Sequence, residues 1–182
     1  MRKLEEKTIS SETIFEGRLL KLKKTQVKLA SGVKATREIV EHPGAVAIIA
    51  ITADNELVLV RQFRKAADTI LLEVPAGVPE KGETGEATAR RELEEETGFH
   101  AKKITKLWEG FASPGYSNEL IQYYLAQELT AVPRRPEEDE QIEVDLVDIE
   151  ACVDMVKNGK IRDNKTMIGI MLAERVTSGQ IY

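Results

Sequence analysis

Three glutamates in the segment from Gly85 to Thr97 are the residues whose types and spacing best suit chemistry. The string EATARRELEEET has high helical propensity, and its spacings of three and four residues place Glu92, Glu95 and Glu96 within an arc of about 100° on a helix. Like charges four residues apart repel by ~0.2–0.5 kcal/mol per pair. The triple therefore indicates either a solvated acidic face or a site for a hard divalent cation.

A longer pattern surrounds these glutamates and runs from Gly77 to Phe99 as GVPEKGETGEATARRELEEETGF. It reads Gly, five residues, Glu83, seven residues, Arg91-Glu92-Leu93, one residue, Glu95-Glu96, one residue, Gly98-Phe99. This string resembles a complete Nudix box. The resemblance implies an α+β fold, namely a Nudix-type α/β/α sandwich with a mixed sheet, in which the box forms a loop, a helix and a second loop.

The family resemblance also implies which residues hold the metal. Hydrolysis of a diphosphate requires that charge on two phosphoryl groups be neutralised and that a water be oriented. Mg²⁺ prefers oxygen ligands, and waters and substrate phosphates usually complete the coordination that protein carboxylates begin. By resemblance, Glu92 and Glu96 are the main ligands of Mg²⁺, with Mn²⁺ a possible substitute, and the backbone carbonyl of Ala76 joins them. Glu95 assists the metal and is a catalytic candidate.

Segments outside the box resemble the ADP-ribose pyrophosphatase subfamily. They run from Arg37 to Ile48, Arg61 to Arg64, Leu71 to Gly77, Ala112 to Glu119 and Glu137 to Val144. The resemblance implies a small nucleotide diphosphate as substrate, with ADP-ribose hydrolysed to AMP and ribose 5-phosphate. Two alternatives stay open: a Nudix pyrophosphatase for another nucleoside diphosphate derivative (a sugar nucleotide or a dinucleotide), and a non-catalytic nucleotide sensor.

Five residues are candidates for substrate binding. By resemblance, Arg37 and Glu73 belong to the adenosine side and Arg64 to the diphosphate, although an arginine here equally suits a surface ion pair. Glu119 follows the Ser-Pro-Gly turn of the subfamily-like segment. Where some relatives place an aromatic residue that stacks on adenine, this chain has Arg18, whose guanidinium can also stack on a base.

The acidic loop PEEDEQIEV offers a carboxylate to prepare the attacking water. A carboxylate bound to Mg²⁺ is a poor base, so the base is expected outside the helix. Matching the loop to the subfamily motif places the base at Glu138 and an extra metal contact at Glu140, with Glu119 the next candidate. The alternative is an acidic loop that is only solvated.

The elements that must position these residues follow from periodicity and turn signals. Helices are expected over 85–97, 148–158 and 163–177, the first with Thr84 as N-cap and Gly98 as a left-handed C-cap. Arg91 and Glu83 are expected to brace the loop through an ion pair. Strands are expected for FEGRLLKLKKTQVKLA, GVKATREIV, AVAIIAIT, ELVLVRQF, TILLEVPAG, KLWEGF, LIQYYLAQEL and IEVDLVD.

Residues 1–42 are expected to form an N-terminal β-hairpin region and residues 43–182 the Nudix domain. The hairpin strands carry an apolar face that one small domain does not fully cover, and the resembling subfamily exchanges this region between subunits. An isologous two-fold interface commonly buries such a face. We therefore expect a homodimer in which the hairpin region helps to build the neighbour's substrate site.

Composition restricts the partners. The net charge of −5 and the lack of a long basic tract argue against nucleic acid as a partner. The segment Lys21–Lys24 is expected to form the solvent-exposed face of a strand. The sequence contains no run of about 18 apolar residues, so no membrane-spanning segment and no membrane binding are expected. Cys152 is the single cysteine, which is typical of a reducing cytoplasmic protein. Its expected role is packing in a helix.

Overall fold

The computed structural model describes residues 4–136 and 140–181. The strands are β1 Lys7–Glu16, β2 Lys21–Lys28, β3 Lys34–Glu41, β4 Ala45–Ala50, β5 Glu56–Arg64, β6 Thr69–Glu73, β7 Ala76–Gly77, β8 Phe99–Phe111, β9 Leu120–Ala131 and β10 Ile142–Asp148. The helices are α1 Gly85–Thr97, α2 Ile149–Lys157 and α3 Asn164–Thr177. The chain forms two compact units: one is Met1–Gly44 with Gly110–Leu120, and the other is Ala45–Glu109 with Ile121–Tyr182. The expected boundary between residues 1–42 and 43–182, and the exchange of the first region between subunits, stay predictions.

The first unit contains a three-stranded antiparallel sheet in the order β1-β2-β3. The expected hairpin is present as β2 and β3, with Lys28 opposite Lys34, and β1 is an additional strand that the sequence analysis did not identify. The segment 110–120 lies along β3, where Val40 N–H donates to the Tyr116 carbonyl oxygen at 2.8 Å. The sheet is thereby extended by a loop that is distant in sequence.

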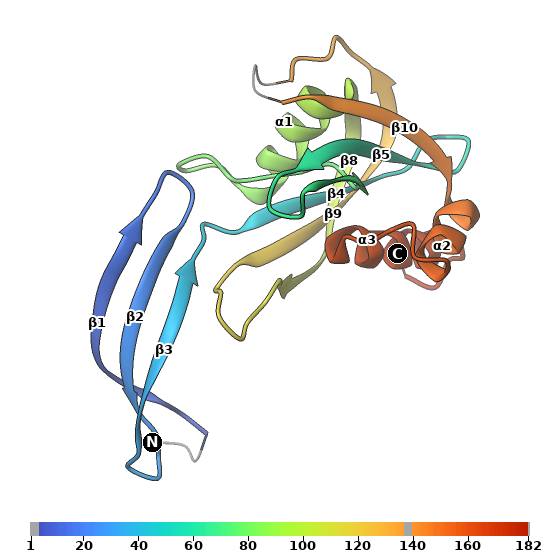
Figure 1. The fold of residues 1–182 in the computed structure, drawn as a ribbon. Helices are drawn as coiled ribbons and strands as arrows, with labels where there is room; N and C mark the ends of the chain where they lie inside the picture. The colour runs from blue at the N-terminus through green and yellow to red at the C-terminus, as the bar shows by residue number, and fades with distance from the viewer. Residues whose placement is uncertain (1–3, 137–139, 182) are drawn as a thin grey trace. The chain divides into compact units, whose positions relative to one another are not determined.

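The second unit has a mixed sheet between helices, which confirms the expected α/β/α architecture (Figure 1). Strand β4 pairs with β9 in parallel and with β7 antiparallel. Its alternate side chains enter two separate cores, as the pleat requires. Ile49 packs with residues of α2 and α3, whereas Ile48 packs with Leu93 of α1. The box helix and the C-terminal helices thus cover opposite faces.

The expected single strand TILLEVPAG is divided in the structure. Strand β6 ends at Glu73 and pairs with β5, while β7 begins at Ala76 and pairs with β4. The break occurs because Pro75 has no N–H to give to a ladder. Its carbonyl oxygen accepts the Ile48 N–H at 2.8 Å, and the preceding Val74 N–H donates to Thr166 Oγ1 at 2.9 Å.

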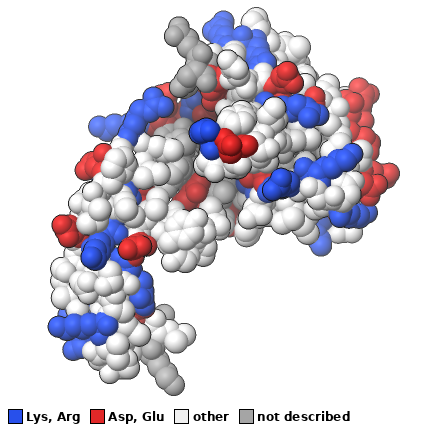
Figure 2. Space-filling view, in the orientation of Figure 1, with Lys and Arg blue, Asp and Glu red and all other residues white. Residues whose placement is uncertain are grey.

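The C-terminal helices agree with the expected ranges. Asp148 and Asp163 cap their N-termini by accepting backbone N–H bonds. Cys152 on α2 is fully buried, and this burial raises the pKa of its thiol to about 11, which agrees with the expected packing role. In the described part of the chain, no helix has the length and apolar character to cross a membrane. On the face drawn in Figure 2, basic and acidic side chains are interspersed.

Candidate active site

Helix α1 begins and ends where its sequence predicts. The Thr84 side chain accepts a hydrogen bond from the Ala87 N–H at 3.2 Å, which satisfies one of the free donors of the first turn. Gly98 ends the helix with φ 73° and ψ 26°, a left-handed conformation that glycine adopts without steric cost. The carboxylates of the helix are therefore carried by a rigid element with fixed ends.

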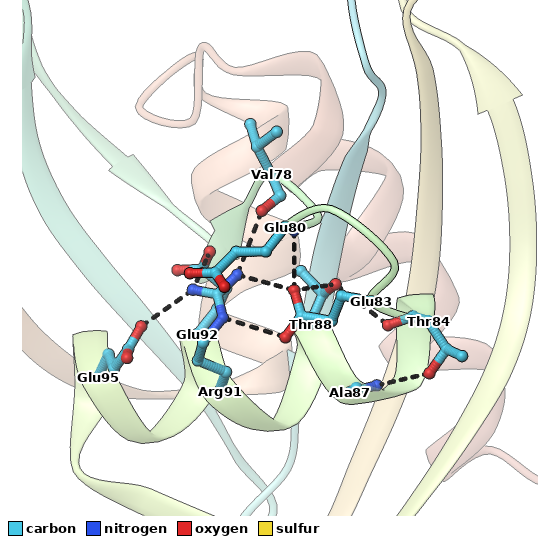
Figure 3. Close-up of polar contacts among 9 residues, drawn as sticks. All are labelled: Val78, Glu80, Glu83, Thr84, Ala87, Thr88, Arg91, Glu92 and Glu95. Carbon is cyan, nitrogen blue, oxygen red and sulfur yellow. Dashed lines mark hydrogen bonds and ion pairs between the residues drawn. The ribbon is translucent and has the colours of Figure 1, made fainter. Parts of the chain in front are cut away.

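Arg91 ties this helix to the loop that precedes it (Figure 3). Its Nε and Nη2 atoms donate to the two carboxylate oxygens of Glu83, each at 3.1 Å, and Nη2 also donates to the Val78 carbonyl oxygen at 3.2 Å. The hydrogen bonds from Arg91 hold the pKa of Glu83 near 2. The expected Arg91–Glu83 ion pair is confirmed.

The same guanidinium also faces the glutamate edge of the helix. Arg91 Nη1 donates to Glu92 Oε1 at 2.8 Å and to Glu95 Oε2 at 3.0 Å (Figure 3). It therefore offsets part of the repulsion between these carboxylates, which are 12% and 34% exposed. Glu95 lies toward solvent, whereas Glu92 lies further inside.

Glu96 is the most deeply buried of the three glutamates, with only 2% of its surface exposed. Its Oε2 accepts the Ala76 N–H at 3.1 Å, and its Oε1 accepts no hydrogen bond from the described residues. Burial, then repulsion by Glu92 and Glu140, raise the pKa of Glu96 to about 8. Burial also raises the pKa of Glu92 to about 7 despite the Arg91 contact. Both carboxylates are therefore held where the protein alone disfavours their ionised form.

Gly77 allows the Glu92 carboxylate to occupy this position. A Cβ built on Gly77 would overlap the Oε1, Cδ and Cγ atoms of Glu92. The glycine that opens the box is therefore required for close approach, which is a different reason from the positive φ of Gly98. Any larger residue at 77 must displace the glutamate.

Beside this pair, Arg64 and Glu73 form a bidentate ion pair. Arg64 Nε and Nη2 donate to the two oxygens of Glu73, each at 2.8 Å. Glu73 is 1% exposed and also accepts from Lys165 Nζ. Burial opposes ionisation of Glu73, but the hydrogen bonds and charges of Arg64 and Lys165 keep its pKa below its usual value. Lys165 lies 92 positions from Glu73, and no pattern in the sequence near Glu73 indicates this contact.

The comparisons with known proteins agree with this geometry. A model described as "NUDIX domain" matches residues 41–167. The chain belongs to the Nudix family. It is 45% identical to the ADP-ribose pyrophosphatase of Bacillus subtilis (strain 168) over 172 residues, which is 93% of each chain. It is 44% identical to the methanol dehydrogenase activator of Bacillus methanolicus over 168 residues, 91% of each.

A solved structure shares the Nudix fold. The chain titled "Crystal structure of ADP compounds hydrolase" aligns with a TM-score of 0.86 and 23% identity, covering 99% of this chain and 98% of that one. At this identity the likeness concerns the fold alone. It agrees with the expected fold class, with its mixed sheet and box helix.

The Nudix glutamates fit a hard divalent cation. Glu92 is half-buried and Glu96 is buried, burial disfavours the ionised form of both, and both offer only oxygen ligands to a cation. Among the described residues, no group of three His, Cys, Asp or Glu side chains is already arranged around a metal position.

Two metal contacts were expected outside the helix, at the Ala76 carbonyl oxygen and at Glu140. The Ala76 backbone touches Glu96 through its N–H, and the expected role of its carbonyl oxygen stays a prediction. Glu140 is half-buried and repels both Glu92 and Glu96, which places its charge near the pair. Glu138 lies outside the described residues.

The remaining predicted Nudix site residues, Arg18, Arg37 and Glu119, belong to the first unit and are described within it. Arg37 on β3 donates to both carboxylate oxygens of Glu6. Glu119 lies 3.9 Å from His42 Nδ1. Arg18 is exposed in the turn between β1 and β2. Their roles in substrate binding stay predictions.

Proposed function

We propose that the chain hydrolyses the diphosphate of ADP-ribose with the help of Mg²⁺, for which Mn²⁺ can substitute. Water adds to one phosphorus atom, the bond from that phosphorus to the bridging oxygen breaks, and AMP and ribose 5-phosphate leave with the two protons of the water shared between them. The observation that carries the proposal is the pair of Glu92 and Glu96 carboxylates, half-buried and buried, on a capped Nudix helix. The relative named ADP-ribose pyrophosphatase supports the substrate.

Glu92 and Glu96 would hold the metal, with Glu140 beside them. A bound divalent cation supplies charge neutralisation at the phosphoryl oxygens and orientation of a water. The protein's own part is to keep the carboxylates in place. Gly77 gives Glu92 room, the Ala76 N–H fixes Glu96, and Arg91 fixes the loop. Glu95 would assist from the solvent side.

Arg64 is the residue that we propose for the diphosphate. Its Nε and Nη2 edge is occupied by Glu73, while Nη1 has no hydrogen-bond partner among the described residues. The Arg64 side chain is 40% exposed, and its guanidinium is attracted by the charge of Glu96. This arrangement supports a donor edge turned toward an anion that lies near the glutamate pair.

The proposed base is Glu138, and the proposed extra metal contact is Glu140. Glu96 and Glu92 are committed to the metal in this proposal, so the proton of the attacking water needs another acceptor. The charge of Glu140 is already close to the pair, which supports the placement of its loop near the reacting groups. Glu119 is the next candidate for the base, and Arg18 and Arg37 are the proposed contacts on the adenosine side.

We propose that the active form is a homodimer in which the first unit completes the partner's substrate site. Every residue of β1 is exposed, and β1 is an edge strand of its sheet. The exposed apolar side chains of this region include Ile9, Ile14, Phe15 and Leu19. Exposed apolar surface on an edge strand favours association with another chain.

A substrate panel tests the proposal. The values of kcat/KM for ADP-ribose, a sugar nucleotide such as GDP-mannose, and the dinucleotide NAD are compared at equal Mg²⁺. The proposal expects ADP-ribose to exceed the others by at least about tenfold, a difference of 1.4 kcal/mol in transition-state stabilisation. A higher value for either competitor would assign another substrate to the same site. No turnover of any of them would favour the nucleotide sensor.

The similarity to the methanol dehydrogenase activator supports a second candidate function. In this alternative the chain stimulates a methanol dehydrogenase. Adding the purified protein to a methanol dehydrogenase and measuring the rate of alcohol oxidation tests it, and Glu96→Gln serves as the comparison. Stimulation by the parent and not by the variant would mean that the hydrolytic site carries the effect.

A further inference from the structure

One carboxylate oxygen organises the start of helix α3. Asp163 Oδ2 accepts hydrogen bonds from Thr166 Oγ1 at 2.6 Å, from Lys165 Nζ at 2.9 Å and from the Thr166 N–H at 3.0 Å. Thr166 is fully buried and Lys165 is 15% exposed. The first turn of the helix therefore presents an ammonium and a hydroxyl in fixed directions.

Both of these groups contact the end of strand β6. Lys165 Nζ donates to Glu73 Oε2, and Thr166 Oγ1 accepts the Val74 N–H at 2.9 Å. The Glu73 side chain and the Val74 backbone are thus both hydrogen-bonded to α3. This attachment is buried, so water replaces neither contact at low cost.

The attached segment connects the two charged groups of the site. Glu73 holds Arg64 by two hydrogen bonds, and three residues further on the Ala76 N–H holds Glu96. Between them the Pro75 carbonyl oxygen accepts the Ile48 N–H. The segment attached to α3 therefore contacts both Arg64 and Glu96.

We propose that Lys165 is a positioning residue for Arg64. It acts through Glu73: Lys165 fixes one oxygen of that carboxylate, and the carboxylate fixes the Nε and Nη2 edge of the guanidinium. The Nη1 edge is then held in one orientation for the diphosphate. This inference rests on the proposed function of Arg64 and assigns to Glu73 a role in orientation besides its predicted place on the adenosine side.

The charges support the same role. Glu73 is one carboxylate shared by Arg64 and Lys165, and Asp163 accepts from the same ammonium, so the four formal charges balance and each cation has a carboxylate partner. Both cations together keep the pKa of Glu73 below its usual value despite its burial. Without Lys165, Glu73 Oε2 would lose one of its two donors, and Arg64 alone would hold the carboxylate.

The test is a double-mutant cycle of Lys165→Met and Arg64→Lys, which removes the forked contact while keeping a charge beside Glu73. Alone, Lys165→Met is expected to lower kcat/KM for the diphosphate substrate about tenfold. Most of this loss should be a rise in KM, because Arg64 is proposed to bind the diphosphate equally in the ground state and in the transition state. In the Arg64→Lys background the further loss should be less than about twofold. Lys165→Arg should restore most of the lost activity.

Lys157→Met is the matched control, because Lys157 also pairs with an aspartate on a helix but is 71% exposed and remote from Glu73. It should leave KM unchanged. Binding of α,β-methylene-ADP, measured by calorimetry in Mg²⁺, should weaken in Lys165→Met by the same factor as KM rises. That measurement decides the inference even if ADP-ribose is not the substrate.

Equal losses from Lys165→Met in both backgrounds, or unchanged KM and analogue binding, would overturn the inference. The proposed function would survive that result if the parent still hydrolyses ADP-ribose. Conversely, the parent could hydrolyse another nucleotide while the variants show the coupled loss. That result would support the role of Lys165 and reject only ADP-ribose as the substrate.

Discussion

The Glu92 carboxylate lies over the backbone of Gly77, in the space that a Cβ at position 77 would fill. The glutamate comes from the second half of the box helix, just past its middle, and the glycine ends the two-residue strand β7. The preceding residue, Ala76, donates its N–H to Glu96, so the two residues of β7 contact both glutamates. The spacing between the first glycine and the glutamates of the box thus has a steric cause.

Replacing Gly77 with Ala should lower kcat because Glu92 must move. A displacement of about 1 Å in a group that positions the reaction can cost roughly 10²-fold in rate. Gly77 has no positive φ, so the change adds little backbone strain. Steady-state kinetics at saturating Mg²⁺ measures the effect.

Gly159→Ala is the control for this variant. Gly159 has φ 74° and nothing within 4 Å of an added Cβ, so Ala there strains the backbone and touches no functional group. It should lower the melting temperature and leave kcat unchanged. If Gly77→Ala behaves like Gly159→Ala, losing stability but keeping its rate, the steric account of the box glycine is wrong.

The sequence predicted the parts of the site that depend on local chemistry. Thr84 and Gly98 mark the ends of α1 because capping needs only residues a few positions apart. The Arg91–Glu83 ion pair was expected from the resemblance to the Nudix box, in which the two residues are eight positions apart. The alternation of β4 side chains between two cores likewise follows from the pleat.

Long-range contacts could not be predicted in the same way. Nothing near Glu73 in the sequence indicates Lys165, because tertiary folding alone brings the two together. The division of TILLEVPAG arises because Val74 and Pro75 bond to α3 and β4 instead of continuing one strand. Strand β1 was missed because KTISSETIFE is exposed along its whole length and lacks the alternation that marks a half-buried strand.

The stability of the metal-free protein should fall as pH rises from 5 to 8. The folded-state pKa values of Glu92 and Glu96, about 7 and about 8, lie above their ordinary 4.5. The folded state therefore binds protons more tightly than the unfolded state in this window. The stabilisation is complete below about pH 4.5 and is lost as pH rises through the folded-state pKa values.

Melting curves in EDTA at pH 5 and pH 8 measure this effect against Glu96→Gln. The variant should lose at least about 3 °C less than the parent, the shift that about 1 kcal/mol causes in a domain of this size. Gln keeps an oxygen for the Ala76 N–H, so the local contact survives. The account fails here if parent and variant show the same pH dependence.

Glu138→Gln and Glu140→Gln should have different kinetic effects. The first should cut kcat strongly, leave KM and the Mg²⁺ dependence nearly unchanged, and remove the acidic limb of the pH–rate profile. The second should raise the Mg²⁺ concentration needed for half-maximal rate. Glu143→Gln, an exposed residue of β10, is the control and should match the parent. A Glu138→Gln rate within a few-fold of the parent would direct the search to Glu119.

Mixed subunits should recover activity if the first unit completes the partner's site. Arg37→Ala and Glu92→Gln chains are each expected to be nearly inactive. Co-expression should restore roughly a quarter of the parent activity, since random pairing makes mixed dimers half of the total and one of their two sites is intact. Light scattering at micromolar concentration measures the oligomeric state. A fully active monomer, or a mixture with no more activity than its parts, would contradict the exchange.

The most direct test of the central claim is the identification of products from ADP-ribose. The purified protein is incubated with ADP-ribose and Mg²⁺, with EDTA, and with EDTA followed by excess Mg²⁺ or Mn²⁺, beside the Glu92→Gln and Glu96→Gln variants. We predict AMP and ribose 5-phosphate in equal amounts, none under chelation, recovery on adding metal, and kcat lower by about 10³-fold or more in both variants. Undiminished product formation in EDTA, or near-normal turnover by folded Glu96→Gln, would contradict a metal-dependent reaction at this glutamate pair.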